Sequence, residues 1–234
     1  IKMFLGKILK IMRNLHFIPN PKTIIINRGF DLKPVFPTME QIIKGRYIAY
    51  GKFDKSIAEL YGIKVEATLG YYNYDLTNSE FKDSVLLKPS YFSYIKNDKR
   101  ISNLILKLSK QTIYREKKLN KFSLHPDCKE WNEAYKIALK NNWTQENRDN
   151  KNAMSEASIV ICDITSTFFV SLYLRKKIYL IDRDFKKGFH PKMRKIIKKY
   201  LPVIPTVDEI INLNTNSYPK SSKKALSEIR EILF

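Results

Sequence analysis

Short apolar runs alternate with helical patterns in the first third of the chain. Apolar runs at residues 23–27, 46–51 and 63–67 predict three strands, and a helix is expected over residues 54–61. Strands of this length that alternate with helices are typical of βαβ units, in which consecutive strands run parallel. The pattern therefore predicts a small α/β unit in this part of the protein.

A longer series of alternating elements begins at Val85. The expected order is a strand from residue 85, a helix over 99–110, a strand over 121–125, helices over 129–140 and 151–157, a strand over 157–162, a helix over 165–174 and a strand over 177–182. This alternation favours a doubly wound, Rossmann-like parallel sheet with helices on both faces. Three more helices are expected near residues 191–200, 206–212 and 219–233.

The two series imply two domains, because the polar stretch at residues 73–84 separates them. The predicted domains are residues 1–80, an α/β domain, and residues 81–234, which carry the longer parallel sheet. The first residue is Ile1 rather than Met, and the first strand begins only near Thr23. The N-terminal domain is therefore expected to be truncated.

The composition is that of a globular protein, with 44% hydrophobic and 28% charged residues. Lys and Arg number 43 against 23 Asp and Glu, so the formal net charge is +20 and the field favours anionic partners such as phosphates, membranes or nucleic acid. A biased Lys-rich composition explains much of this charge equally well. Charge alone therefore does not choose among these partners.

The two cysteines, Cys128 and Cys162, have neither a disulfide framework nor metal-ligand spacing. A reducing, cytoplasmic compartment without a metal or other cofactor is the expectation. No apolar run approaches the roughly 20 residues of a membrane-spanning helix. Residues 1–15 instead predict a basic amphipathic helix, which either packs on the domain or lies on an anionic membrane surface.

Ligands of open parallel sheets bind outside the carboxyl ends of the strands, so the residues that follow each strand are candidates for a site. His125 and Pro126 follow one strand, where an imidazole suits contact with a phosphate or transfer of a proton. An ordinary turn explains the same two residues. The absence of Walker A, GxGxxG and HExxH patterns excludes several other kinds of site.

A second candidate follows the buried strand that ends before Asp163. The chain passes within two residues into a helix that begins at Thr165, Ser166 or Thr167. Unpaired amides and hydroxyls at a helix start favour anions, although the same residue types also cap ordinary helices. We expect His125 and Ser166 on one edge of the sheet, and we expect Asp163 to be buried and hydrogen-bonded.

The stretch from Val85 to Asp182 resembles the C-terminal half of teichoic-acid-type CDP-glycerol glycerophosphotransferases, which have a GT-B fold. Their His-Pro and Thr-Asp-Tyr-Ser-Ser motifs correspond here to His125-Pro126 and to Cys162-Asp163-Ile164-Thr165-Ser166. Upstream, residues 70–75 are similar to the family's Gly-Tyr/Leu-Pro-x-x-Asp turn. The resemblance implies a donor-binding C-terminal domain and an acceptor-side N-terminal domain.

The resemblance also implies roles for individual residues. His125 is the expected catalytic residue and also contacts the donor phosphates. On the acceptor side, Arg28 and Lys33 are the weaker candidates, and Arg28-Gly29 stands where the family has the His-Gly pair of its catalytic base. The implied donor-binding residues are His125, Pro126, Asp163, Thr165, Ser166 and Thr167.

Bacterial transferases that use CMP-activated sialic acid or Kdo share a His-Pro and a Ser-Ser or Ser-Thr pair, which Ser166-Thr167 matches. Both groups bind a cytidine nucleotide as donor and act on a polysaccharide or lipid acceptor of the cell envelope. We therefore expect a peripheral transferase at the inner face of the membrane. Two further interpretations are an inactive truncated relative and a basic nucleic-acid-binding protein, which only the net charge supports.

Overall fold

The computed structural model describes residues 24–26, 46–49, 51–60, 64–68, 84–89, 98–110, 119–123, 133–147, 150–183, 191–213 and 218–234. The chain forms two compact units. The first comprises residues 1–72, 187–191 and 232–234, and the second comprises residues 73–186 and 192–231. The predicted domain boundary near residue 80 stays a prediction.

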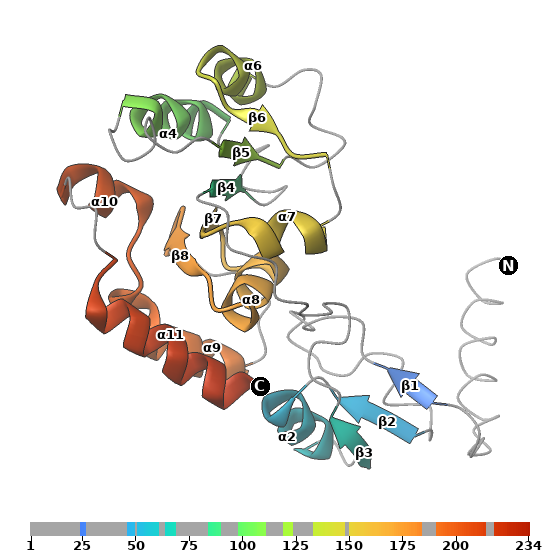
Figure 1. Cartoon of the computed structure of the whole chain (residues 1–234). Coiled ribbons are helices and arrows are strands. Elements are labelled where there is room, and N and C mark those ends of the chain that lie inside the picture. Colours follow the sequence, from blue (N-terminus) through green and yellow to red (C-terminus); the bar gives the residue numbers. More distant parts are fainter. Residues whose placement is uncertain are drawn as a thin grey trace, which may run out of the picture. The chain divides into compact units, whose positions relative to one another are not determined.

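The first unit contains a parallel sheet in the order β1-β2-β3. Its elements are β1 (Ile24–Ile26), β2 (Arg46–Ala49), α2 (Lys52–Leu60) and β3 (Val65–Thr68) (Figure 1). Tyr47 of β2 is buried, and its hydroxyl donates to Oδ1 of Asp54 at 3.3 Å. This bond ties the helix to the strand that precedes it.

The second unit contains a five-stranded sheet, all parallel, in the order β6-β5-β4-β7-β8 (Figure 1). The elements of this sheet layer are β4 (Ser84–Lys88), α4 (Asp98–Lys110), β5 (Leu119–Phe122), α6 (Glu133–Lys140), β6 (Thr144–Gln145), α7 (Asn150–Glu156), β7 (Ile159–Cys162), α8 (Ser166–Tyr173) and β8 (Lys177–Leu180). The predicted parallel α/β architecture is confirmed.

The chain starts this sheet at its centre and builds it outward in two directions. It runs from β4 through β5 to β6, and then returns to add β7 and β8 on the other side of β4. Because parallel crossovers are right-handed, α4 and α6 cover one face and α7 and α8 the other. The change of direction creates a topological switch point between β4 and β7, where ligands of such sheets bind.

The central strands are apolar throughout because both of their faces are covered. Val85, Leu86 and Leu87 of β4 are at most 1% exposed, and all four residues of β7 are buried. Continuous apolar runs are typical of parallel strands packed between two layers of helices. The switch point therefore lies between two buried strands.

The sequence pattern did not predict β6, which has only two residues. It pairs with β5 through Lys121 and Phe122. Trp143, directly before it, is 2% exposed and donates from Nε1 to Oγ of Ser109 at 3.0 Å. A strand this short has no periodicity of its own, and pairing and the buried indole define it instead.

The C-terminal segment covers the outer edge of β8. It contains α9 (Pro191–Tyr200), a 3-10 turn (Leu201–Val203), α10 (Val207–Leu213) and α11 (Lys220–Leu233). The amide of Leu180 donates to the carbonyl of Pro205 at 2.9 Å, so the chain adds a short parallel bridge to this edge. Exposed edges invite pairing with other chains, and this segment closes one of them.

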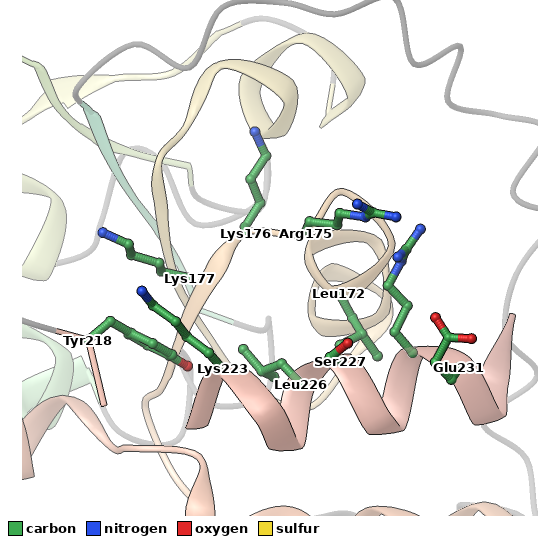
Figure 2. A pocket seen from close by; sticks show the side chains of 10 residues that line it. Leu172, Arg175, Lys176, Lys177, Tyr218, Lys223, Leu226, Ser227 and Glu231 are labelled. Carbon is green, nitrogen blue, oxygen red and sulfur yellow. The ribbon is translucent and has the colours of Figure 1, made fainter. Parts of the chain in front are cut away.

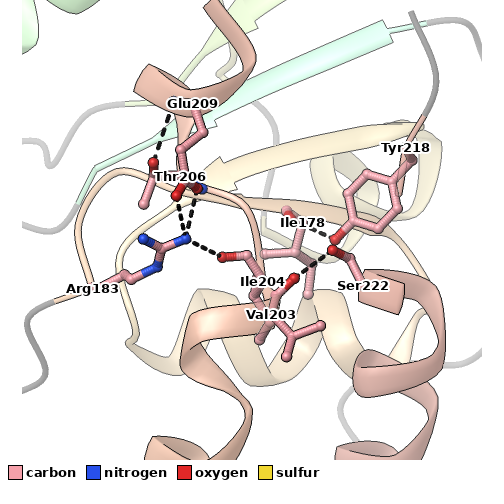
Figure 3. A network of polar contacts seen from close by, with 8 residues as sticks. All are labelled: Ile178, Arg183, Val203, Ile204, Thr206, Glu209, Tyr218 and Ser222. Carbon is pink, nitrogen blue, oxygen red and sulfur yellow. Dashed lines mark hydrogen bonds and ion pairs between the residues drawn. The ribbon is translucent and has the colours of Figure 1, made fainter. Parts of the chain in front are cut away.

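Side-chain hydrogen bonds fasten the same segment (Figure 3). Arg183 donates to Oε2 of Glu209 at 2.6 Å, and the hydroxyl of Tyr218 donates to the carbonyl of Ile178 at 2.8 Å. Ser222 donates to the carbonyl of Val203. The start of α11 is therefore held against β8.

No helix in the described parts of the chain combines the length and the apolar character that crossing a bilayer requires.

Lys176, in the turn between α8 and β8, is a buried lysine whose effect on stability can be measured. It is 4% exposed and donates from Nζ to the carbonyl of Ser155. Burial lowers its pKa from 10.5 to about 8. Between these values the unfolded chain binds more protons than the folded one, so this group makes the free energy of unfolding rise with pH.

Relative to Lys176→Met, the wild-type protein should gain on the order of 1–2 kcal/mol between roughly pH 7 and roughly pH 9.5. Urea denaturation at both pH values measures the difference. Lys177→Met, at the exposed neighbouring position, is the control. A similar gain relative to that variant would show that the trend does not come from the buried ammonium group.

Candidate functional site

The turn from β7 into α8 lies at the carboxyl edge of the five-stranded sheet. Asp163 is 8% exposed, and its carbonyl accepts a hydrogen bond from the amide of Thr165 at 2.9 Å. The prediction that Asp163 is buried is confirmed. That its carboxylate accepts hydrogen bonds from nearby donors stays a prediction.

The start of α8 differs from an ordinary capped helix. Thr165 occupies the N-cap position, with φ −136° and ψ −169°, but its side chain makes no capping hydrogen bond. Phe168 stands where a capping box has Glu or Gln. The Thr165 hydroxyl is therefore not committed to the helix, and capping does not explain why this residue is a threonine.

Ser166 and Thr167 form the first turn of α8. Ser166 is exposed, whereas Thr167 is buried at 7% exposed. Amides at the very start of a helix have no acceptor within it, and in α8 the first amide to find one is that of Phe168, which donates to the carbonyl of Thr165 at 3.0 Å. The turn therefore presents the hydroxyls of Thr165 and Ser166 next to amides that favour an anion.

Lys88 adds a cationic group to this edge. It belongs to none of the motifs that the sequence analysis identified. It is the last residue of β4 and lies opposite Cys162 of β7 in the sheet register. Its Nζ donates to Oγ of Ser123, which follows β5, at 3.2 Å. Burial lowers the pKa of this ammonium group. The sequence feature that could have identified it is a lysine at the end of an otherwise apolar run.

Arg100, in the first turns of α4, also belongs to this edge. It donates from Nη1 to Oδ2 of Asp182 at 2.6 Å and from Nη2 to the carbonyl of Ile181 at 3.1 Å. The hydrogen bond to Asp182 raises the pKa of Arg100, and the charge of Asp163 adds to this effect. Asp182 therefore neutralises this arginine.

His125 and Ser166 are predicted to lie at one edge of the sheet, and the strands that precede them show where that edge is. Ser123, directly after β5, donates from its amide to the carbonyl of Leu87 at 2.9 Å. The ends of β5, β4 and β7 thus lie side by side at one edge. His125 and Pro126 lie outside the described residues, as do Arg28, Lys33 and residues 1–15, so their predicted roles stay predictions.

Comparison with protein-family models gives no match, and no curated protein shows significant similarity to the chain. Among the residues that the structure describes, no group of three His, Cys, Asp or Glu side chains is arranged to hold a metal ion.

The lack of a side-chain cap at Thr165 predicts an unusual response to mutation. Thr165→Ala should change the free energy of unfolding by less than about 0.5 kcal/mol, whereas loss of a working cap costs roughly 1 kcal/mol. Thr206 at the start of α10 is the matched control, because its amide donates to Glu209 at 2.7 Å and its Oγ1 accepts from the Glu209 amide at 3.4 Å.

Denaturant melts of Thr165→Ala and Thr206→Ala measure the two costs. We expect only the second variant to be destabilised by about 1 kcal/mol. Equal destabilisation would mean that the Thr165 side chain does cap α8, in contradiction to its hydrogen-bond geometry.

Proposed function

We propose that the protein is a transferase that binds a cytidine-nucleotide donor at the carboxyl edge of the five-stranded sheet. The observation that supports this most is the sheet order, which brings Lys88, Ser123 and the Thr165–Ser166 turn to one switch point. The donor class comes from the resemblance to CDP-glycerol glycerophosphotransferases, within a GT-B architecture. The acceptor is a polymer of the cell envelope, reached at the inner face of the membrane.

The groups at this edge suit a phosphate chain. A half-buried ammonium group interacts more strongly with an anion than an exposed one, because less solvent screens it. The amides of the first turn of α8 and the hydroxyls of Thr165 and Ser166 donate from the neighbouring strand end. Such donors, fixed before the substrate arrives, stabilise the charge that develops on phosphoryl oxygens during transfer.

In the proposed reaction, a hydroxyl of the acceptor attacks the phosphorus that carries the glycerol. A new phosphate ester bond forms, the bond from this phosphorus to the bridging oxygen breaks, and CMP leaves. The proton of the hydroxyl passes to a base, a role that we propose for His125. Arg28 and Lys33 are the proposed contacts on the acceptor side.

Lys88→Gln should weaken binding of CMP and CDP by roughly tenfold to a hundredfold, since a hydrogen bond to a charged group contributes about 1.5–3 kcal/mol. Affinity for the wild-type protein should also fall at alkaline pH. The pKa of Lys88 lies below that of an ordinary lysine, so the ammonium form that binds phosphate is lost earlier as pH rises.

Isothermal titration calorimetry measures these affinities. Lys140→Gln is the charge-matched control, because Lys140 is exposed in the last turn of α6. In a parallel sheet the helix after a strand runs back, so this residue lies away from the carboxyl edge. Equal affinity of the Lys88 and Lys140 variants would refute the proposed donor site.

A second prediction concerns the residues of the proposed phosphate contact. Ser166→Ala and His125→Ala should each weaken binding of CDP-glycerol, and the double variant should lose less than the sum of both effects, because the two residues grip one phosphate. Titrations of all three variants test this. Strictly additive losses would place the two side chains at separate parts of the ligand.

The rival functions give different results in the same assays. Tighter binding of CMP-sialic acid than of CDP-glycerol would assign the protein to the CMP-sugar transferases. Nucleic-acid binding would be independent of Lys88 and would fall steeply with salt.

A further inference from the structure

A second positively charged site lies at the opposite edge of the same sheet. It is a pocket of about 360 Å³ between the end of α8, the start of β8 and one side of α11 (Figure 2). The residues that line it are Leu172, Arg175, Lys176, Lys177, Tyr218, Lys223, Leu226, Ser227, Arg230 and Glu231. Since Lys177 begins β8, the pocket is at the amino edge, away from Lys88 at the carboxyl edge.

The lining is unusually rich in cations. Five lysine and arginine residues line the pocket together with a single acidic residue, Glu231. Lys176 is turned away from α11 and donates to the carbonyl of Ser155, so it is committed to the protein itself (Figure 2). Lys223 reaches from α11 toward Lys177 (Figure 2). Four cations thus remain for a ligand.

Arg175 is held in a conformation that an arginine does not favour. Its φ is 56°, in the left-handed region, at the position after α8 where glycine is most common. The amide of Arg175 donates to the carbonyl of Leu172, and that of Lys176 to the carbonyl of Ser171. The helix end therefore needs this backbone shape but not this side chain. A side chain kept in a strained position is a reason to look for a ligand.

Arg230 of α11 adds a second arginine next to Arg175. Burial lowers the pKa of Arg230, and the charge of Arg175 lowers it further. Its Nε is buried and has no hydrogen-bond partner among the described residues. Two arginines that repel each other are stabilised when an anion binds near both.

The dipole of α8 gives a simpler account of part of this charge. Cations near a helix C-terminus are favourable, which covers Arg175, Lys176 and Lys177. It does not cover Lys223, which comes from α11, whereas Arg230 lies in the last turn of α11, where the dipole of that helix also favours a cation. The convergence of two elements with the same charge points to a bound anion.

Part of the lining is apolar. Leu172 and Leu226 are buried, and the hydroxyl of Tyr218 donates to the carbonyl of Ile178. Ser227 and Glu231 complete the lining. The volume exceeds what a lone phosphate fills and lies in the range of small-molecule pockets. A ligand with one anionic and one carbon-rich end fits both halves of the lining.

We propose that this pocket binds the phosphate group of an organic phosphate ester, with the cations on the phosphate and the leucines and tyrosine on its organic part. Arg175 and Arg230 donate to the phosphate oxygens, and Lys177 and Lys223 supply further charge. A soluble phosphate monoester and a phospholipid headgroup share this chemistry. The site is independent of the proposed donor site.

Two probes separate these sources. The first is phenyl phosphate, which combines a phosphate with an apolar ring, and the second is phosphatidylcholine vesicles with and without phosphatidylglycerol. Calorimetry follows the first and co-sedimentation the second. Binding of phenyl phosphate assigns a soluble ester, and binding only to vesicles that contain phosphatidylglycerol assigns a lipid headgroup.

Lys223→Gln and Arg230→Gln should each weaken binding by about tenfold or more. Lys224→Gln is the matched control, because Lys224 is the next residue on the same helix, 80% exposed and paired with Glu228 at 3.8 Å. It removes the same charge from the protein without touching the pocket, so affinity should be unchanged.

Equal losses in the Lys223 and Lys224 variants would show general attraction to a basic protein and overturn the proposal, as would the lack of binding to both probes. Titration of Lys88→Gln with phenyl phosphate keeps the two proposals apart. Phenyl phosphate bound in the pocket loses affinity in the Lys223 and Arg230 variants but not in Lys88→Gln. A loss in Lys88→Gln alone would place phenyl phosphate at the proposed donor site and overturn the pocket proposal.

Discussion

The pairing of β4 with a strand on each side is the constraint on which the rest of the second unit depends. Because β5 and β7 both hydrogen-bond to β4, three strand ends meet at one edge although long stretches of sequence separate them. The apolar side chains of β4 hold this arrangement between two layers of helices. Lys88 becomes part of a site only because its strand is the central one.

Some of the positive charges of the protein are paired with carboxylates, whereas others are not. Several cations of the second unit are neutralised by neighbouring carboxylates, as in Lys121–Glu146 at 3.0 Å, Arg183–Glu209 at 2.6 Å and Arg100–Asp182 at 2.6 Å. The amino-edge pocket has one carboxylate for five cations. A cluster of cations with few carboxylates therefore indicates an anion site better than the net charge of +20 does.

The two edges of the sheet bring together groups that favour anions in different ways. At the carboxyl edge, the strand ends deliver single residues, and the helix start at Ser166 supplies amides. At the amino edge, the cations come from the end of α8, the first residue of β8 and the side of α11. Hydrogen bonds from Tyr218 and Ser222 hold the start of α11 in place.

The sequence by itself determined most of the elements that the structure describes. The apolar runs located the strands and most helices to within a few residues, and they identified the β7–α8 turn with its buried Asp163, because both signals are local. Burial follows from an unbroken apolar run, and a helix start follows from the residues around it.

Only the tertiary structure decided which of these elements meet. The strand order, the two-residue β6, the hydrogen bond from Lys88 to Ser123, the Thr165 hydroxyl that does not cap α8 and the approach of Arg230 to Arg175 all depend on segments or conformations that no local pattern encodes. Periodicity shows which face of a strand or helix is buried. It does not show which segment covers that face, because each segment pairs with the partner that gives the whole chain its lowest free energy.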